Sequence, residues 1–246
     1  MKRPLIILTG PTAVGKTAAS IGLAKAVDGE IISADSMQVY RGMDIGSAKI
    51  SREEMGGIRH YLVDVLEPEE EFNVVKFQHL AKQAAEEIYS RNRIPIVVGG
   101  TGFYIQALLY DIDFTENDGD MSLRRELERT AEEKGPEYLH QLLHEVDPQA
   151  AAELHPNNIK RVIRALEFYR QTGKRISEHN RKEREKESPY QYAYFVLTDD
   201  RSRLYERIDR RVDVMMKEGL LDEVRSLRER GVKRTCTSMQ GLGYKE

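Results

Sequence analysis

Eight consecutive residues near the amino terminus have the types and the spacing of a phosphate-binding loop. Residues 10–17 fit the pattern G-x-x-x-x-G-K-[ST], and they are Gly10, Pro11, Thr12, Ala13, Val14, Gly15, Lys16 and Thr17. Glycines let successive backbone N–H groups of such a loop point at phosphate oxygens, and the helix that follows adds the positive end of its dipole. Lys16 supplies a full positive charge, and the Thr17 hydroxyl can ligate Mg²⁺. The pattern predicts a site for a polyphosphate or a diphosphate, with Thr17 as the magnesium ligand.

The loop alone does not specify which phosphate compound binds. Proteins that hydrolyse nucleotides with such a loop usually have an apolar strand that ends in a magnesium-binding Asp. Here the strongest later strand, expected at residues 94–98, is followed by Gly99-Gly100-Thr101-Gly102, and Leu62-Val63-Asp64 is a weak substitute. The leaving group can therefore be a diphosphate from a compound other than a nucleotide.

Asp35 is the first candidate for proton transfer. It follows residues 31–34, near the carboxyl end of an expected strand. In open α/β sheets that edge faces the ligand, so we expect Asp35 near the phosphate loop. A carboxylate there can hold an incoming nucleophile and accept its proton. Two alternatives stay open: an Asp that caps the next turn, and a ribose-binding Asp, although the glycine spacing does not fit a dinucleotide site.

Thr101 is a candidate by the same reasoning. It follows a buried strand and the pair Gly99-Gly100, and a helix is expected from Phe103 onward. The Thr101 hydroxyl either caps that helix or contacts a ligand in the same crevice.

Three arginines recur at a spacing of four on an expected helix that begins near residue 201. Arg203, Arg207 and Arg211 therefore lie on one face of it. One interpretation is a solvated face paired with Glu206 and Asp209. The other is that one arginine reaches the diphosphate, because a guanidinium stays charged and can bind two oxygens at once.

A second basic stretch covers residues 157–186. It has ten Lys/Arg against four Asp/Glu, so its net charge is +6 while the whole chain carries −3. Lys160, Arg161 and Arg164 are its centre, at helical spacing. This asymmetry indicates either a contact with a phosphate backbone or a solvated helix.

Short apolar runs that alternate with amphipathic stretches place these residues. We expect strands at 5–8, 31–35, 61–66, 94–98 and 192–197, and helices at 16–27 and 74–88. Residues 115–188 show no convincing strand and have a helical period. The pattern predicts an α/β fold, with a P-loop NTPase-like parallel sheet, helices on both faces and an inserted helical domain. Residues 1–112 and 190–246 would form the core, and residues 113–189 the insertion.

Composition limits the class of protein. The chain has 246 residues, 40% hydrophobic and 32% charged, so a globular domain with a large core is expected. Its single cysteine, Cys236, cannot form an intramolecular disulfide. No stretch approaches the roughly 20 apolar residues that cross a bilayer. We expect a cytoplasmic protein that does not contact membranes. Residues 241–246 read as the middle of an element, so a longer natural chain is expected.

These features resemble the tRNA dimethylallyltransferase family. The phosphate loop matches, and so do the segments Asp35-Ser36-Met37-Gln38-Val39-Tyr40-Arg41-Gly42-Met43-Asp44-Ile45-Gly46-Ser47-Ala48-Lys49, Val98-Gly99-Gly100-Thr101-Gly102, and His155-Pro156-Asn157 followed by Arg161 and Arg164-Ala165-Leu166-Glu167. The resemblance covers the whole chain. Members of the family continue beyond the position of Glu246 into a helical tail that also contacts tRNA.

The resemblance implies a mechanism and a set of site residues. Dimethylallyl diphosphate would bind residues 10–17 with Mg²⁺ at Thr17, and Lys16 and Arg211 would neutralise the departing diphosphate. The adenine that is 3′-adjacent to the anticodon would be flipped into a channel, where Asp35 takes a proton from its exocyclic amine. The implied catalytic residues are Asp35, Thr101 and Arg211. The implied contacts with the flipped nucleotide are Asp35, Ser36, Met37, Gln38 and Thr101. The implied contacts with the tRNA anticodon stem-loop are Arg124, Ile159, Lys160, Arg161, Val162, Ile163 and Arg164.

Three other classes compete with this interpretation. A small-molecule P-loop kinase and an adenylate isopentenyltransferase both need a phosphate loop and a base, but neither needs a long cationic surface. A nucleotide-operated binding switch would need the magnesium-binding Asp that the later strand lacks. We therefore expect a monomeric prenyltransferase that acts on tRNA.

Overall fold

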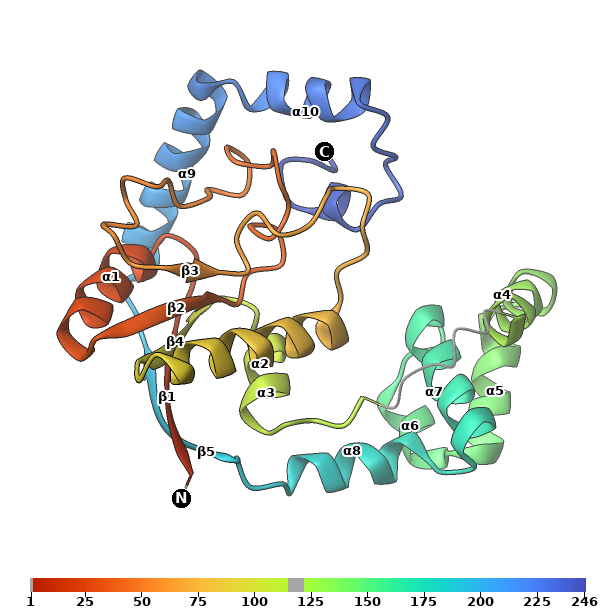
Figure 1. Ribbon diagram of the computed structural model, residues 1–246. Coiled ribbons are helices and arrows are strands. Elements are labelled where there is room, and N and C mark those ends of the chain that lie inside the picture. The colour runs from red at the N-terminus through yellow and green to blue at the C-terminus, as the bar shows by residue number, and fades with distance from the viewer. Residues whose placement is uncertain (1, 115–121) are drawn as a thin grey trace. The chain divides into compact units, whose positions relative to one another are not determined.

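The chain forms two compact units in a computed structural model that describes residues 2–114 and 122–246 (Figure 1). One unit contains Met1–Asp111 and Ser188–Glu246, and the other contains Ile112–Glu187. The boundaries expected from the sequence were 112/113 and 189/190. Residues 115–121 of the expected insertion lie outside the described residues.

The first unit is built on a five-stranded sheet. Its strands are β1 (Arg3–Thr9), β2 (Gly29–Ser33), β3 (His60–Tyr61), β4 (Ile94–Gly99) and β5 (Tyr190–Val196), in the spatial order β3-β2-β4-β1-β5. Every pair of neighbouring strands is parallel. The carboxyl ends of β1, β2 and β4, which carry the phosphate loop, Asp35 and Thr101, therefore meet at one edge of the sheet. The predicted α/β class with a parallel sheet is confirmed.

Helices cover both faces of the sheet. Alternate residues of a strand point to opposite faces, so Ile31 packs in a cluster with α1 (Lys16–Val27) while Ile32 packs in a cluster with α2 (Val74–Ser90). The α2 helix begins at Asn73, whose side chain accepts a hydrogen bond from the Lys76 N–H at 3.0 Å. The remaining helices of this unit are α3 (Gly102–Leu109), α9 (Arg201–Glu218), α10 (Leu220–Glu229) and the short 3₁₀ helix η1 (Ser238–Gln240).

The strand expected at residues 61–66 is wrong in its length. The observed strand β3 ends at Tyr61, because Leu62 and Asp64 have φ angles of 62° and 54°. These left-handed conformations do not occur in a regular strand. Leu66 pairs only with Tyr40, in an isolated bridge that lies outside the sheet. Asp64 consequently does not end a strand, as a magnesium-binding Asp of the usual kind would.

In the residues of it that the structure describes, the second unit has helices joined by loops and no strand. Its helices are α4 (Ser122–Lys134), α5 (Pro136–Val146), α6 (Pro148–Glu153), α7 (Ile159–Thr172) and α8 (Ile176–Arg184). They bury a separate apolar cluster that includes Leu139, Leu143 and Val162, each fully buried. Asp147, only 1% exposed, accepts hydrogen bonds from the backbone of Ala150 and from both the N–H and the hydroxyl of Ser177. This buried carboxylate joins the starts of α6 and α8.

None of the helices in the described ranges is long and apolar enough to cross a bilayer.

Candidate active site

The phosphate loop connects the end of β1 to the start of α1. A Cβ atom at Gly10 would lie 2.5 Å from the Leu197 carbonyl oxygen, so only glycine allows the loop to pass the end of β5. Gly15 precedes α1 with a φ of 96°, and no side chain caps the helix there. The first backbone N–H groups of α1 are therefore left to bind a ligand, in the arrangement expected for an anion site at a helix N-terminus.

Lys16 lies across its own loop. Its ammonium group donates hydrogen bonds to the carbonyl oxygens of Gly10 at 2.8 Å and Pro11 at 2.7 Å. Burial lowers the pKa of Lys16, the Asp35 carboxylate acts against that shift, and the positive charge of Arg211 adds to it. Lys16, Asp35 and Arg211 are thus close enough to interact electrostatically. Asp35 and Arg211 each lie within electrostatic range of the phosphate-loop lysine.

Asp35 follows β2 and begins a turn. Its Oδ1 atom accepts hydrogen bonds from the backbone N–H groups of Met37 at 2.8 Å and Gln38 at 3.2 Å. Oδ1 therefore has the capping role that the sequence left open. Among the described residues none donates a hydrogen bond to Oδ2. One oxygen of the carboxylate fixes its orientation, and the other can accept a proton.

Thr101 lies beside Asp35, at the end of the neighbouring strand. The Thr101 N–H donates to the Ala34 carbonyl oxygen at 3.4 Å, and a Cβ atom at Gly99 would lie only 2.2 Å from that same oxygen. Glycine at position 99 is what allows the ends of β2 and β4 to approach. Thr101 occupies the N-cap position of α3, but its side chain makes no capping hydrogen bond. Its hydroxyl is left to contact a ligand.

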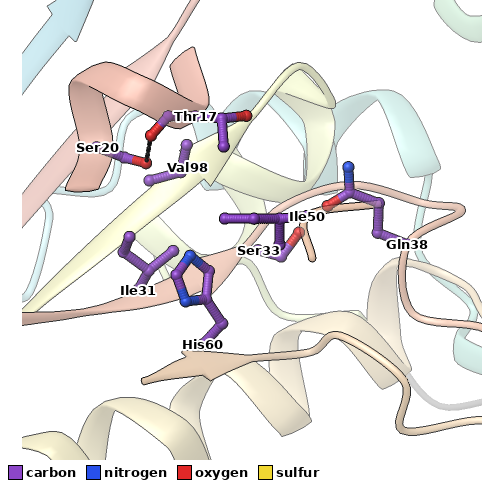
Figure 2. Close-up of a pocket in the computed structure, with 8 residues that line it drawn as sticks. All are labelled: Thr17, Ser20, Ile31, Ser33, Gln38, Ile50, His60 and Val98. Atoms are coloured by element: carbon purple, nitrogen blue, oxygen red, sulfur yellow. Dashed lines mark hydrogen bonds between the residues drawn. The ribbon is translucent and has the colours of Figure 1, made fainter. Parts of the chain in front are cut away.

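A small cavity of about 40 Å³ opens beside Thr17 (Figure 2). It lies between α1, the strands β2, β3 and β4, and the loop after β2. The residues that line it are Thr17, Ser20, Ile31, Ser33, Gln38, Ile50, His60 and Val98. Of these, only Thr17 and Gln38 were expected at the site. His60 gave no signal in the sequence, since its place in the wall depends on the pairing of β3 with β2.

The three arginines of α9 have different environments. Arg203 lies 3.7 Å from Asp199 and 3.8 Å from Asp200, and Arg207 lies 2.9 Å from Asp199. Their partners are thus at the start of the helix rather than at Glu206 and Asp209, as one interpretation of the sequence expected. Arg207 also donates to the Ala13 carbonyl oxygen of the phosphate loop, at 3.4 Å.

Arg211 differs from the other two. It forms no ion pair with any residue that the structure describes, and it is near enough to Lys16 to lower its pKa. Of the three arginines, Arg211 is the one that lies within electrostatic range of Lys16 and forms no ion pair with a described residue.

Comparisons with known proteins agree with this arrangement. A family model described as IPP transferase matches residues 38–246. The tRNA dimethylallyltransferase of Lachnoclostridium phytofermentans is 64% identical over 244 residues, which make up 99% of this chain and 78% of that protein. The chain belongs to the IPP transferase family.

Solved structures support membership of the IPP transferase family. The full-length tRNA isopentenylpyrophosphate transferase from Bacillus halodurans is 47% identical with a TM-score of 0.70, and the match covers 100% of this chain and 76% of that one. A eukaryotic dimethylallyltransferase described as acting on tRNA is 33% identical with a TM-score of 0.84, over 99% of this chain and 60% of that one. The resemblance to the tRNA dimethylallyltransferases and the P-loop NTPase-like fold are confirmed.

In this IPP transferase the remaining residues that were expected to contact tRNA lie in the second unit. Lys160 and Arg161 are exposed on α7, and Ile159 packs partly against the apolar cluster. Val162 and Ile163 are 0% and 3% exposed and belong to that cluster. The side chains of Val162 and Ile163 are thus occupied in the core, and within this segment the exposed charge belongs to Lys160 and Arg161.

Arg124 and Arg164 gather around one buried carboxylate. Arg124 donates two hydrogen bonds to Glu167, at 3.0 and 2.8 Å, and Glu167 is only 3% exposed. Burial lowers the pKa of Arg164, the Glu167 charge acts against this shift, and Arg124 adds to it. Glu167 therefore joins α7 to Arg124 of α4, and its charge also favours the charged form of Arg164.

Proposed function

We propose that this chain transfers a dimethylallyl group from dimethylallyl diphosphate to the exocyclic amine of the adenine 3′-adjacent to the anticodon of a tRNA, and releases diphosphate. The observation that carries the proposal is that the phosphate loop after β1 and the Asp35 carboxylate after β2 lie at one edge of the sheet of an IPP transferase, with Arg211 within electrostatic range of Lys16. Two positive groups face the leaving group there, and one carboxylate has an oxygen left for a proton.

The residues divide the chemistry between them. The allylic C–O bond to the diphosphate breaks, a C–N bond forms to the adenine amine, and the displaced amine proton moves to Oδ2 of Asp35. The backbone N–H groups of residues 10–17, together with Lys16 and Arg211, stabilise the charge that develops on the departing diphosphate. The Thr101 hydroxyl, beside Asp35, can hold the nucleotide while the bond forms.

The donor set near the loop fits a magnesium ion held mainly by the substrate. The described residues contain no group of three His, Cys, Asp or Glu side chains that could hold a metal. A single hydroxyl, that of Thr17, combined with diphosphate oxygens and water is the kind of set that Mg²⁺ accepts. When bound, the ion would supply further positive charge to the diphosphate.

Recognition of tRNA is assigned to the helical unit. Lys160 and Arg161 are exposed on a segment with a net charge of +6, in a chain whose total charge is −3. A cationic surface of this kind binds a phosphate backbone and is not needed for a small acceptor.

We infer that the protein acts as a monomer in the cytoplasm.

The test is to offer the purified protein both donors and both kinds of acceptor. Labelled dimethylallyl diphosphate and γ-labelled ATP are each incubated with bulk tRNA, with adenosine monophosphate, and with a tRNA whose adenine at the target position is replaced by guanine. We expect label from dimethylallyl diphosphate to appear only in the tRNA that keeps the target adenine. Phosphoryl transfer from ATP without prenylation would indicate a kinase, and prenylation of adenosine monophosphate alone would indicate an adenylate isopentenyltransferase.

A further inference from the structure

A single carboxylate binds three consecutive backbone N–H groups of the loop that follows β2. Glu223 of α10 accepts hydrogen bonds from the N–H groups of Asp44 at 2.7 Å, Ile45 at 2.8 Å and Gly46 at 3.1 Å. Successive N–H groups that converge on one anion form a nest, which is a strong and directional contact. Glu223 lies 179, 178 and 177 residues away from these three residues in the chain. The contact therefore joins two distant parts of the first unit.

The carboxyl-terminal segment reinforces the same contact. The Tyr244 hydroxyl donates to Glu223 at 2.5 Å, and a Cβ atom at Gly46 would lie 2.6 Å from the Tyr244 ring. Only glycine at position 46 leaves room for that ring. Tyr244 is 4% exposed, and burial raises its pKa, so its hydroxyl keeps its proton and remains a donor. Glu223 is thus saturated with four donors.

The loop that Glu223 holds also orients Gln38. The Gln38 amide donates to the carbonyl oxygens of Ser47 at 3.4 Å and Ala48 at 3.1 Å. These two carbonyls directly follow the nest of residues 44–46. The backbone N–H of Gln38 in turn donates to Oδ1 of Asp35, and its side chain lines the cavity beside Thr17. Hydrogen bonds and the short backbone stretch of residues 44–48 therefore connect α10 to Gln38 and Asp35.

Met37 is held from the same side. A Cβ atom at Gly241 would lie 2.6 Å from the Met37 sulfur, so the Met37 side chain packs directly against the backbone that follows η1. Met37 is therefore held directly by the segment from α10 to residue 244, and Gln38 is held by it through the loop of residues 44–48. This segment itself contributes no group to the phosphate loop.

We propose that Glu223 is a positioning residue for the transfer reaction, which holds the loop of residues 44–48 so that Met37, Gln38 and the Asp35 carboxylate keep the geometry that the acceptor nucleotide requires. The inference rests on the proposed function. Glu223 does not touch the donor site, so its removal affects the alignment of the acceptor and leaves diphosphate binding unchanged. A misplacement of about 1 Å in such an arrangement can reduce a rate by roughly a hundredfold.

The experiment compares E223A, E223Q and Y244F with the unchanged chain and with the matched control E229A. Glu229 is exposed on the same helix and makes no contact with the loop. For each variant the affinity for dimethylallyl diphosphate, the affinity for tRNA, the melting temperature and the single-turnover rate per folded molecule are measured. We expect E223A to lose at least about tenfold in single-turnover rate with both affinities within about twofold of the unchanged chain. E223Q keeps one acceptor oxygen and Y244F removes one donor, so both should lose less, and E229A should lose nothing.

Two further measurements separate positioning from a structural role. Amide hydrogen exchange of residues 44–48 should accelerate in E223A while exchange in β1 and β4 stays unchanged. In a Q38A background, E223A should cost less than about threefold, because the group through which Glu223 acts has already been removed. A lower melting temperature with an unchanged rate per folded molecule would overturn the proposal. A double variant whose loss of rate equals the product of the E223A and Q38A losses would overturn it as well. If E223A does not fold, the same criteria apply to E223Q. If the unchanged chain prenylates no tRNA, the proposed function itself is refuted. That result is distinguishable from failure of the Glu223 proposal, in which the unchanged chain is active and E223A is equally active.

Discussion

At the scale of single residues, Asp35 has two oxygens with two different tasks. Oδ1 accepts the N–H groups of Met37 and Gln38, and Oδ2 receives none from the described residues. Because a cap and a base can share one carboxylate in this way, the two interpretations of Asp35 do not exclude each other. They can be separated by substitutions that remove one task at a time.

We expect Asp35→Asn to fold normally, since its carbonyl oxygen can keep both hydrogen bonds of the cap, yet to be slower by roughly two to four orders of magnitude, the usual contribution of a positioned base. Asp35→Ala loses the cap as well and should also lose about 1 kcal/mol of stability. Single-turnover rates and thermal unfolding of both variants test this. An Asn variant with substantial activity would show that Asp35 only positions the amine.

Arg211 and Arg203 form a matched pair on one helix. We expect Arg211→Ala to lower kcat/KM for dimethylallyl diphosphate by roughly 10- to 100-fold, as for the loss of a charged hydrogen bond worth about 1.5–3 kcal/mol. Arg203 is exposed and lies 3.7 Å from Asp199 and 3.8 Å from Asp200, so Arg203→Ala removes ion pairs worth at most about 1 kcal/mol and its kinetics should match those of the unchanged chain. Steady-state kinetics on both variants test this. Equal losses would mean that the whole arginine face of α9, and not Arg211 in particular, acts on the diphosphate.

At the scale of elements, helices were easier to predict than strand ends. The helix expected at 16–27 has those bounds, since its apolar spacing and the glycine before it are both local signals. β3 was misjudged because positive φ angles at Leu62 and Asp64 leave no trace in an apolar run. The partners of Arg203 and the role of Glu223 depend on contacts between segments, and spacing along one helix could not indicate them.

A buried carboxylate joins β2 to the start of β4. Glu30, 2% exposed, binds Arg91 at 2.5 Å, Arg93 at 2.9 Å and the Tyr61 hydroxyl at 3.1 Å. Burial alone would raise the pKa of Glu30, but these partners outweigh it and hold the pKa below its ordinary value. The stabilisation is therefore complete above the unfolded-state pKa and is lost as the pH falls through the lower folded-state pKa.

We accordingly expect Glu30→Gln to be less stable than the unchanged chain at neutral pH, and the difference to shrink as the pH falls below about 4.3, the ordinary pKa of a glutamate. Urea unfolding at a series of pH values measures it. A difference that does not vary with pH would mean that the charge of Glu30 contributes nothing. Exposed Glu229→Gln is the control.

At the scale of the whole molecule, charge is unevenly distributed. The net charge is −3, while residues 157–186 carry +6, and Lys160 and Arg161 are exposed within that range. Tight binding of a polyanion by an acidic protein must then depend on a local surface. The sequence alone indicated the cationic stretch, but it could not show that Val162 and Ile163 turn inward.

We expect tRNA affinity to fall steeply with salt, and the double substitution of Lys160 and Arg161 by Gln to reduce the slope of log affinity against log salt by roughly 0.7–0.9 for each lost phosphate contact. Filter binding between low and moderate salt measures the slope. Arg129→Gln together with Lys134→Gln, both exposed on α4 and outside residues 157–186, is a control for the loss of two positive charges in the same unit. A slope that is unchanged in the first variant would show that α7 is merely solvated.

The position of β5 has a consequence for synthesis on the ribosome. β1 lies between β4 and β5 in the sheet, and Gly10 of the phosphate loop lies against the carbonyl of Leu197. A nascent chain that has emerged as far as β4 holds the whole phosphate loop and Asp35 but lacks one neighbour of β1. Translation must add the whole helical unit before Tyr190–Val196 appears. At about 5–20 residues per second this leaves one edge of β1 unpaired for several seconds, and an unpaired strand edge is a site at which a nascent chain can aggregate.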